Sequence, residues 1–170
     1  GRAPEDCKIL FGAQPIIGSS EAEALERQEL HNSLVPQDGG MAILSAHLDF
    51  DLGKLDPNED MTKREEPELQ RLKTRYRKET GEGMTVAEVA KRHGQSVGLP
   101  QFVGTASSIA DQMEAFMETT GGDGFMLSPI HNPGAIEDFV DLVVPELQRR
   151  GLYREDYTGT TQRDHLSQDD

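Results

Sequence analysis

The sequence contains no tryptophan, few aromatic residues of any kind (5%) and a single cysteine, Cys7. One cysteine excludes an internal disulfide framework and a zinc site built from several cysteines, and it is typical of a reducing compartment. No apolar run approaches the roughly 20 residues that cross a bilayer. The first residues, GRAPEDCK, also lack the basic and then apolar pattern of a secretory signal. The sequence therefore predicts a cytoplasmic protein with no membrane partner.

Positive charge is also scarce, because 17 Lys and Arg face 31 Asp and Glu, which gives a formal net charge of −14. Proteins that bind nucleic acid generally do so through a net basic face, so this charge argues against a nucleic-acid partner. One segment, 63–78, holds seven cations but only one aromatic residue, Tyr76. A solvated helical face explains this segment better than a polyanion site does.

Acidic residues crowd the segment 49–60, which raises the question of a calcium loop. A calcium-binding helix-loop-helix needs acids at positions 1, 3 and 5, glycine at position 6 and glutamate at position 12. A loop that starts at Asp56 has Met61 at position 6, and a loop that starts at Asp49 has Lys54 there. Both registers fail, so we predict a solvated acidic loop, with an adventitious divalent cation as the alternative.

The hydrophobic pattern predicts an alternation of strands and helices. Apolar runs predict buried strands at 8–17 and 124–129. Helical spacing predicts helices over about 21–34, 68–79 and 135–150. A further helix is expected to begin at the Thr85 cap and to stop at Gly94. Another is expected around 109–117, with its end at Gly121. Ser20 with Glu23 and Thr85 with Glu88 have the spacing of a capping box. Pro145 predicts a kink in the last helix, since proline removes one backbone hydrogen bond.

Two segments stand outside this alternation. The pattern breaks down from Pro36 to Pro67, and we interpret about 36–83 as an insertion between core elements. Long excursions of this kind often serve as lids or binding segments. The residues from about 154 to 170 form a polar tail, and the whole chain, 1–170, is assigned to one domain.

The order of elements favours an α/β fold with a parallel sheet and helices packed outside it. Two strands cannot form a stable sheet, and a closed (β/α)8 barrel needs about 250 residues. The first residue is glycine instead of methionine, which suggests a piece of a longer product. We therefore expect the last part of a TIM barrel, incomplete in this chain.

Several polar residues lie where a parallel barrel has its site. Residues just past the carboxyl ends of strands line the active-site face, which predicts Ser128, His131 and Asn132 as substrate-proximal residues. Gln14, near the end of the first strand, and His47, in the excursion, are two further candidates. The alternative is that 131–134 is only a turn that enters the last helix. No catalytic residue, cofactor-binding residue or metal ligand can be assigned, and no Gly-x-Ser-x-Gly motif supports serine hydrolysis.

The sequence also resembles a known family. FVGTASSIADQMEAFMETTGGDGFMLSP and GAIEDFVDLVVPELQRRGLYREDYTGTTQRDHL resemble the end of bacterial-luciferase-like flavin monooxygenases of the nitrilotriacetate and dibenzothiophene-sulfone monooxygenase group. ILFGAQPIIGSSEAEA and LSAHLDFDLGKLD resemble a late strand and the insertion of that group, so the match covers roughly 8–166.

This resemblance implies the C-terminal part of a TIM barrel that works with reduced FMN, delivered by a separate flavin reductase, and with O2. The implied reaction oxygenates a small organic substrate, typically with cleavage of a C–N or C–S bond. The family's flavin contacts lie upstream of the matched region, so the chain alone is expected to be inactive. The missing N-terminal part of the barrel is its first partner, and the complete protein is expected to be a homo-oligomer.

Two other functions remain open at this point. A deazaflavin-dependent reductase of the same superfamily would transfer hydride without oxygen. A non-catalytic barrel fragment would instead pair its exposed strand edges with a partner.

Overall fold

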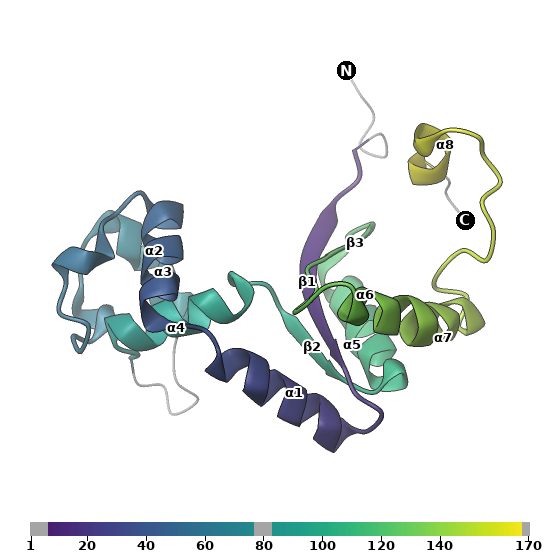
Figure 1. The fold of residues 1–170 in the computed structure, drawn as a ribbon. Helices are drawn as coiled ribbons and strands as arrows, with labels where there is room; N and C mark the ends of the chain where they lie inside the picture. The colour runs from purple at the N-terminus through teal and green to yellow at the C-terminus, as the bar shows by residue number, and fades with distance from the viewer. Residues whose placement is uncertain (1–6, 77–82, 168–170) are drawn as a thin grey trace. The chain divides into compact units, whose positions relative to one another are not determined.

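The computed structural model describes residues 7–76 and 83–167, which form two compact units (Figure 1). The first unit takes its described residues from 1–28 and 100–170, and the second comprises 29–99. The boundary falls inside helix α1 (Glu21–Ser33). The other elements of the first unit are β1 (Leu10–Ile17), β2 (Gln101–Gly104), α5 (Ala106–Thr120), β3 (Gly124–Leu127), α6 (Gly134–Asp138), the π-helical segment η4 (Phe139–Val143), α7 (Val144–Arg149) and α8 (Gln162–Ser167).

The first unit is built on a three-stranded parallel sheet with the order β2-β1-β3. The first half of β1 pairs with β3, from Leu10 opposite Gly124 onward, and the second half pairs with β2, from Gln14 opposite Gln101 onward. The predicted parallel α/β architecture is therefore confirmed. Strand β2 was not predicted, because its four residues directly follow Pro100 and are too few to show a period.

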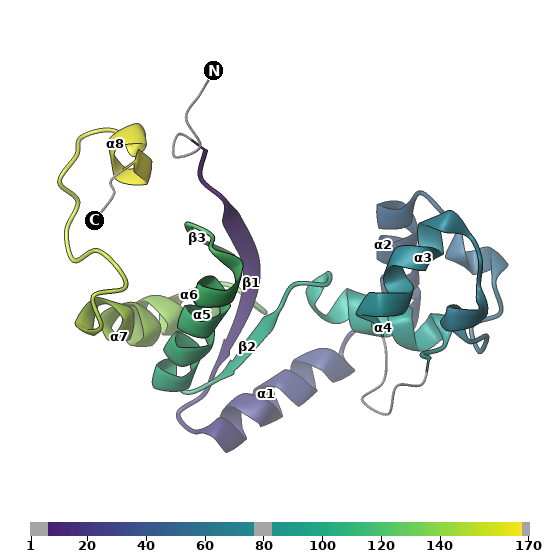
Figure 2. The ribbon, with the colours of Figure 1, turned by 180° about the vertical axis from the view of Figure 1, so that it is seen from behind.

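Helices α5, α6 and α7 cover one face of this sheet (Figures 1 and 2). Four phenylalanine rings from the strands and α5 form its aromatic core, with centroid distances of 5.3–5.8 Å: Phe11, Phe102, Phe116 and Phe125. The predicted apolar stripe of α5 packs there through the buried Ile109 and Met113. On the opposite face Leu10 is 52% exposed and Met126 is 66% exposed. That face is left uncovered at the β1-β3 pair.

The last helical stretch is continuous but changes its winding. Pro145 cannot donate a backbone hydrogen bond, and the turn before it is a π-helical segment in which the amide of Val144 donates to the carbonyl of Phe139. The kink predicted at Pro145 thus takes the form of a wider, π-helical turn just before the proline. Of the predicted apolar face, Phe139, Val143 and Leu147 are buried, whereas Val140 is 53% exposed.

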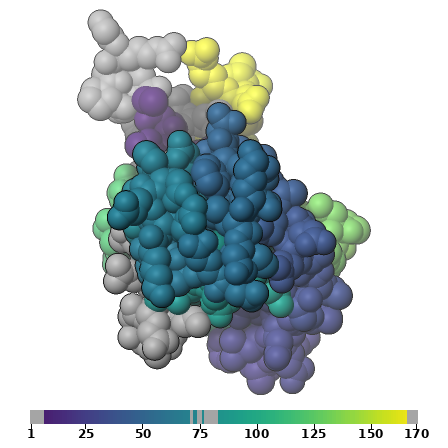
Figure 3. Space-filling view, turned by 90° about the vertical axis from the view of Figure 1, so that its left-hand side faces the viewer, coloured from purple at the N-terminus to yellow at the C-terminus, as the bar shows by residue number. Residues whose placement is uncertain are grey.

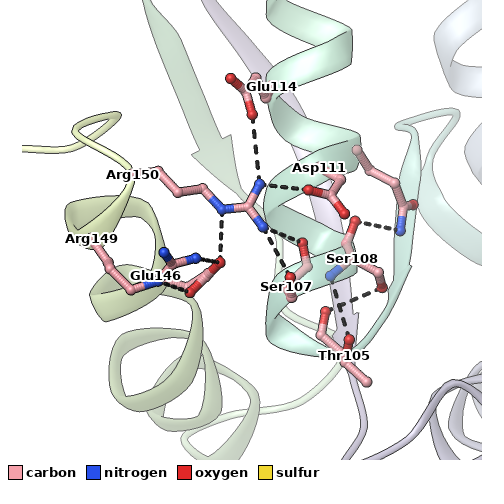
Figure 4. A network of polar contacts seen from close by, with 9 residues as sticks. Thr105, Ser107, Ser108, Asp111, Glu114, Glu146, Arg149 and Arg150 are labelled. Atoms are coloured by element: carbon pink, nitrogen blue, oxygen red, sulfur yellow. Dashed lines mark hydrogen bonds and ion pairs between the residues drawn. The ribbon is translucent and has the colours of Figure 1, made fainter.

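An ionic network fastens α7 to α5 (Figure 4). The Arg150 guanidinium donates to Asp111 at 2.6 Å and to Glu146 at 2.7 Å, and it also donates to the hydroxyl and carbonyl of Ser107. Glu146 accepts two further hydrogen bonds from Arg149. These bonds from Arg149 and Arg150 lower the pKa of Glu146 from 4.5 to about 2.

The second unit is helical and has its own core. The helices predicted at 68–79 and from the Thr85 cap are found as far as the described residues reach, whereas the stretch 36–67, where the pattern broke down, also forms a helix and two 3-10 turns. The second unit contains α2 (Gln37–Leu48), the 3-10 turns η2 (Leu52–Lys54) and η3 (Met61–Lys63), α3 (Pro67–Arg75) and α4 (Val86–Ser96). Figure 3 shows the outer surface of this unit, where the α2 to α3 region appears in blue and teal. Buried members of its core include Leu44, Leu52, Met61, Leu69 and Val89.

The helix end predicted at Gly94 in this unit was wrong. Gly40 and Gly94 lie within helices and allow these two helices to pack closely. A Cβ added to Gly40 of α2 would lie 2.3 Å from the carbonyl oxygen of Ala90 on α4. A Cβ added to Gly94 would lie 3.1 Å from the Cα of Gly40. Helix α4 therefore continues past Gly94, where we expected it to stop, and ends when Val97 adopts a left-handed conformation with φ 54°.

Polar side chains cap the turns of both units. Thr85 and Glu88 form the predicted capping box. At α1 the Ser20 hydroxyl accepts from the amide of Glu23, but the Glu23 carboxylate reaches back to Ser19 instead of Ser20. In the acidic loop, three aspartates accept backbone amides two residues ahead: Asp51, Asp56 and Asp60. This supports the solvated-loop interpretation.

The tail of the first unit is held locally. The Arg154 guanidinium donates to the carbonyl of His165 at 2.7 Å and lies 5.2 Å from the ring centre of Tyr157. The amide of Gln148 donates to the carbonyl of Arg154, which ties the tail to the end of α7.

Candidate functional site

A row of polar side chains crosses the sheet on the face opposite the aromatic core. Gln14 and Gln101 are register partners on β1 and β2, and their neighbours Ala13 and Phe102 point into the core. Side chains alternate along a strand, so both glutamines lie on the other face. The β1-β3 ladder continues beyond β3, where the amide of Ser128 donates to the carbonyl of Ala13 at 2.8 Å. This register sets Ser128 level with Gln14.

Gln14 is the buried member of this row, with 5% of its surface exposed. Its amide oxygen accepts a hydrogen bond of 2.8 Å from Nε2 of Gln101. The amide oxygen of Gln101 in turn accepts one of 2.8 Å from Nε2 of Gln28 on α1. Each amide of the row therefore donates to the next, from Gln28 to Gln101 to Gln14. Ile16, the next residue of β1 on the same face as Gln14, is 1% exposed.

A small hollow lies at the carboxyl end of β1. Its cavity volume is about 10 Å³, and its lining includes Ile16, Ile17, Arg27, His131 and Asp138. The Arg27 guanidinium donates to the carbonyl of Ile17 at 2.9 Å and to Asp138 at 3.0 Å. Ligand pockets usually enclose about 300–1,000 Å³, so this hollow is too small to be a complete one.

The structure separates the predicted residues of the β3-α6 connection. His131 is exposed at the rim of the hollow, and its Nε2 would lie 3.0 Å from a Cβ on Gly134, the first residue of α6. Asn132 is exposed and precedes Pro133 through a cis peptide bond. Ser128 belongs to the polar row, whereas His131 and Asn132 belong to the turn that enters α6.

The amino terminus of α5, next to this row, is already occupied. The Glu21 carboxylate accepts from the backbone amide and the hydroxyl of Thr105 at 3.1 and 3.2 Å. Hydrogen bonds from the Ser108 hydroxyl and then from the Thr105 amide lower the pKa of Glu21. This helix end therefore offers no open anion site.

His47 lies in the second unit, on α2. Its Nδ1 is 3.0 Å from Nε2 of His93 on α4, and Nδ1 of His93 is 2.8 Å from the hydroxyl of Tyr76. His93 is 6% exposed, whereas His47 is exposed. The predicted His47 is thus one end of a polar chain that begins in a helical core.

Sequence reasoning missed the residues that orient the predicted ones, namely Gln28, Gln101, Arg27, His93 and Tyr76. The signal for Gln101 was a glutamine in a strand too short to recognise. Among residues 7–76 and 83–167, no group of three His, Cys, Asp or Glu side chains is arranged as metal ligands.

Comparison with known proteins identifies the chain's relatives. No protein-family model matches the chain. It is 39% identical over 98% of its length to a dibenzothiophene-sulfone monooxygenase of Rhodococcus erythropolis, and 35% identical over 98% to nitrilotriacetate monooxygenase component A of Aminobacter aminovorans. In each case it covers 38% of the relative.

The fold agrees with these sequences. The crystal structure of DmoA from Hyphomicrobium sulfonivorans superposes with a TM-score of 0.81 at 29% identity, over 94% of this chain and 34% of that one. Over nearly all of its length the chain is thus similar in sequence and fold to one part of these monooxygenases. It spans about a third of the length of these monooxygenases. In the described residues no helix is both long and apolar enough to cross a membrane.

Proposed function

We propose that this chain forms the C-terminal part of the barrel of a flavin-dependent monooxygenase. The complete enzyme uses reduced FMN and O2 to oxygenate a small organic substrate, with cleavage of a C–N or C–S bond. The observation that carries the proposal is homology over 98% of the chain to relatives named as monooxygenases of a sulfone and of nitrilotriacetate. These relatives favour oxygenation over a deazaflavin-dependent reduction.

The described residues fit one wall of a flavin site. The sheet face opposite the aromatic core carries the amide of Gln14 and the buried Ile16, and the hollow beside His131 lies at the carboxyl end of β1. They do not hold a phosphate group, since Glu21 occupies the amino terminus of α5. The phosphate contacts are therefore assigned to the rest of the barrel, and no residue of this chain is proposed for them.

When bound, the reduced flavin supplies the reaction with O2, and the protein supplies orientation and exclusion of water. In this chain the aromatic core and the Arg150 network hold the strands and helices of that wall in place. Gln14 and Ser128 present polar atoms at its centre, and His131 lies at its edge. His47, on α2 of the second unit, is proposed as a further substrate-proximal residue.

The partners follow from the same proposal. A separate flavin reductase delivers reduced FMN in the cytoplasm, and the remainder of the barrel pairs with the free edges of β2 and β3. Both strands pair only with β1 in the part of the chain that the structure describes.

The experiment is an FMN titration, followed by fluorescence, on this chain alone and on the chain extended by its upstream coding sequence. Binding in the extended protein only is the expected result. Tight binding by the isolated 170 residues would show that the flavin site lies within this chain and that our division of the barrel is wrong. Absence of binding in both proteins would favour the non-catalytic fragment.

A further inference from the structure

The hydrogen bonds that join the three glutamines of the polar row all run in the same direction. Each amide group has an oxygen that accepts and an NH2 that donates. Gln28 donates to Gln101, and Gln101 donates to Gln14, at 2.8 Å in both cases. The oxygen of Gln14 is therefore engaged, and its NH2 group stands at the end of the row.

Gln14, at the end of this row, is almost buried, but its side chain still has a donor that no residue in the described part of the chain accepts. Gln14 is 5% exposed, and within the described residues its side chain takes part in the single hydrogen bond from Gln101. No fully buried side-chain nitrogen or oxygen atom in these residues lacks a partner, so the amide nitrogen of Gln14 keeps a small exposed area. A donor held in an almost buried position without a partner costs free energy unless an acceptor meets it.

We propose that the Gln14 NH2 group donates a hydrogen bond to an acceptor oxygen of a ligand bound against this face of the sheet. Gln101 and Gln28 are positioning residues, because they fix which end of the Gln14 amide faces the ligand. The ligand class is a molecule with a carbonyl, sulfone or carboxylate oxygen, which is either the flavin ring or the substrate. This inference rests on the proposed flavin monooxygenase function.

Strand geometry favours this assignment over an ordinary core amide. Gln14 lies level with Ser128, whose hydroxyl extends the polar row toward β3. The same face carries Leu10 and Met126, which are more than half exposed. The buried Gln14 amide thus borders an apolar surface that is exposed at Leu10 and Met126, as in a ligand wall with few, well-placed polar groups.

The test compares three variants in the complete protein. Gln14→Met keeps the side-chain volume and removes the donor. Gln14→Glu replaces the donor by an acceptor. Gln101→Glu leaves Gln14 intact but cannot donate to it, so the Gln14 amide must turn its NH2 toward Glu at position 101 and present its oxygen to the ligand. Gln37→Glu, an exposed position on α2, is the control for the added charge.

The first readout is the Kd for FMN, and the second is the Kd of the FMN-loaded protein for dibenzothiophene sulfone and for nitrilotriacetate. A rise of roughly tenfold in the Kd for FMN in all three variants, with Gln37→Glu unchanged, assigns the acceptor to the flavin. An unchanged Kd for FMN with a similar rise for either organic probe assigns the acceptor to the substrate. Circular dichroism and thermal midpoints establish that the variants fold, and Gln14→Met carries the test if the charged variants do not.

Unchanged affinity for FMN, together with unchanged or absent affinity for both organic probes, overturns this inference and leaves the proposed function intact. Failure of the unmodified protein to bind FMN overturns both. If Gln14→Met weakens binding but Gln101→Glu does not, Gln14 is the donor to the ligand, and Gln101 does not position it.

Discussion

Nε2 of His93 lies 3.0 Å from Nδ1 of His47, which joins a buried histidine of α4 to an exposed one of α2. The other ring nitrogen of His93 faces the Tyr76 hydroxyl at 2.8 Å. The imidazole of His93 therefore has a polar partner on both sides within an otherwise apolar core. This arrangement fixes the orientation of His47 relative to its own unit.

Tyr76→Phe should lower the free energy of unfolding of the chain by about 1–3 kcal/mol, because it leaves Nδ1 of His93 without that partner in a buried position. Urea unfolding checks this. Tyr153→Phe, an exposed tyrosine in the tail, is the matched control and should change stability by less than about 0.5 kcal/mol. Equal effects of the two substitutions would show that the Tyr76 hydroxyl contributes nothing specific.

Gly40→Ala should destabilise the second unit by about 1–3 kcal/mol, because the added Cβ would lie 2.3 Å from the backbone oxygen of Ala90. Gly39→Ala in the same helix is the control. Its Cβ would meet only the Pro36 ring, at 3.1 Å, and alanine favours a helix over glycine by up to about 1 kcal/mol. Hydrogen exchange of the amides in α2 and α4 measures both, and an equally tolerated Gly40→Ala would refute the close packing.

Acid should weaken the attachment of α7 to α5 through Glu146. Its folded pKa of about 2 is below the ordinary 4.5, so its contribution to stability is present above pH 4.5 and is lost as the pH falls toward 2. Glu146→Gln should remove that part of the pH dependence. Urea unfolding at pH 7 and at pH 3 tests this. Glu155→Gln, an exposed residue of the tail, should keep the full dependence.

Met126→Glu should reduce self-association of the isolated chain, because Met126 is 66% exposed beside Leu10 on the uncovered sheet face. Sedimentation or size-exclusion chromatography at several concentrations measures it. Val140→Glu alters an apolar side chain of similar exposure on η4 and is the control. If Val140→Glu has the greater effect, association does not occur through the open face.

The sequence predicted elements whose cause is local. Strand β1 was an apolar run, the cap of α4 was a Thr85 and Glu88 pair, and the end of α5 was Gly121, which has a φ of 69°. Each of these depends on residues within a few positions, so a single sequence carries the information.

The errors have a tertiary cause. Gly40 and Gly94 look like helix breakers in sequence, and only the contact between α2 and α4 explains why glycine stands there. Strand β2 exists because β1 pairs with it, since four residues carry no period of their own.

The residues of the candidate site also differ in whether their cause is local or tertiary. Gln14 and Ser128 were selected from their places near predicted strand ends, and the register sets them level, although Gln14 lies in the middle of β1. Their supporting residues could not be predicted, because Gln28 and Gln101 are 73 residues apart and Gln101 and Gln14 are 87 apart. His47 was selected as a residue of an irregular excursion, whereas it lies on a regular helix and has a buried partner.

The pairing of β1 sets the order in which this chain is able to fold. Its pairing with β3 sets Leu10 opposite Gly124, and its pairing with β2 sets Gln14 opposite Gln101, which is 87 residues away. Contacts this distant close large loops at an entropic cost, whereas the contacts among α2, α3 and α4 are nearer in sequence. We expect the helical unit to form first and to shorten the effective loop that separates β1 from its partners. A substitution that weakens the crossing of α2 and α4 would then delay assembly of a sheet that it does not touch.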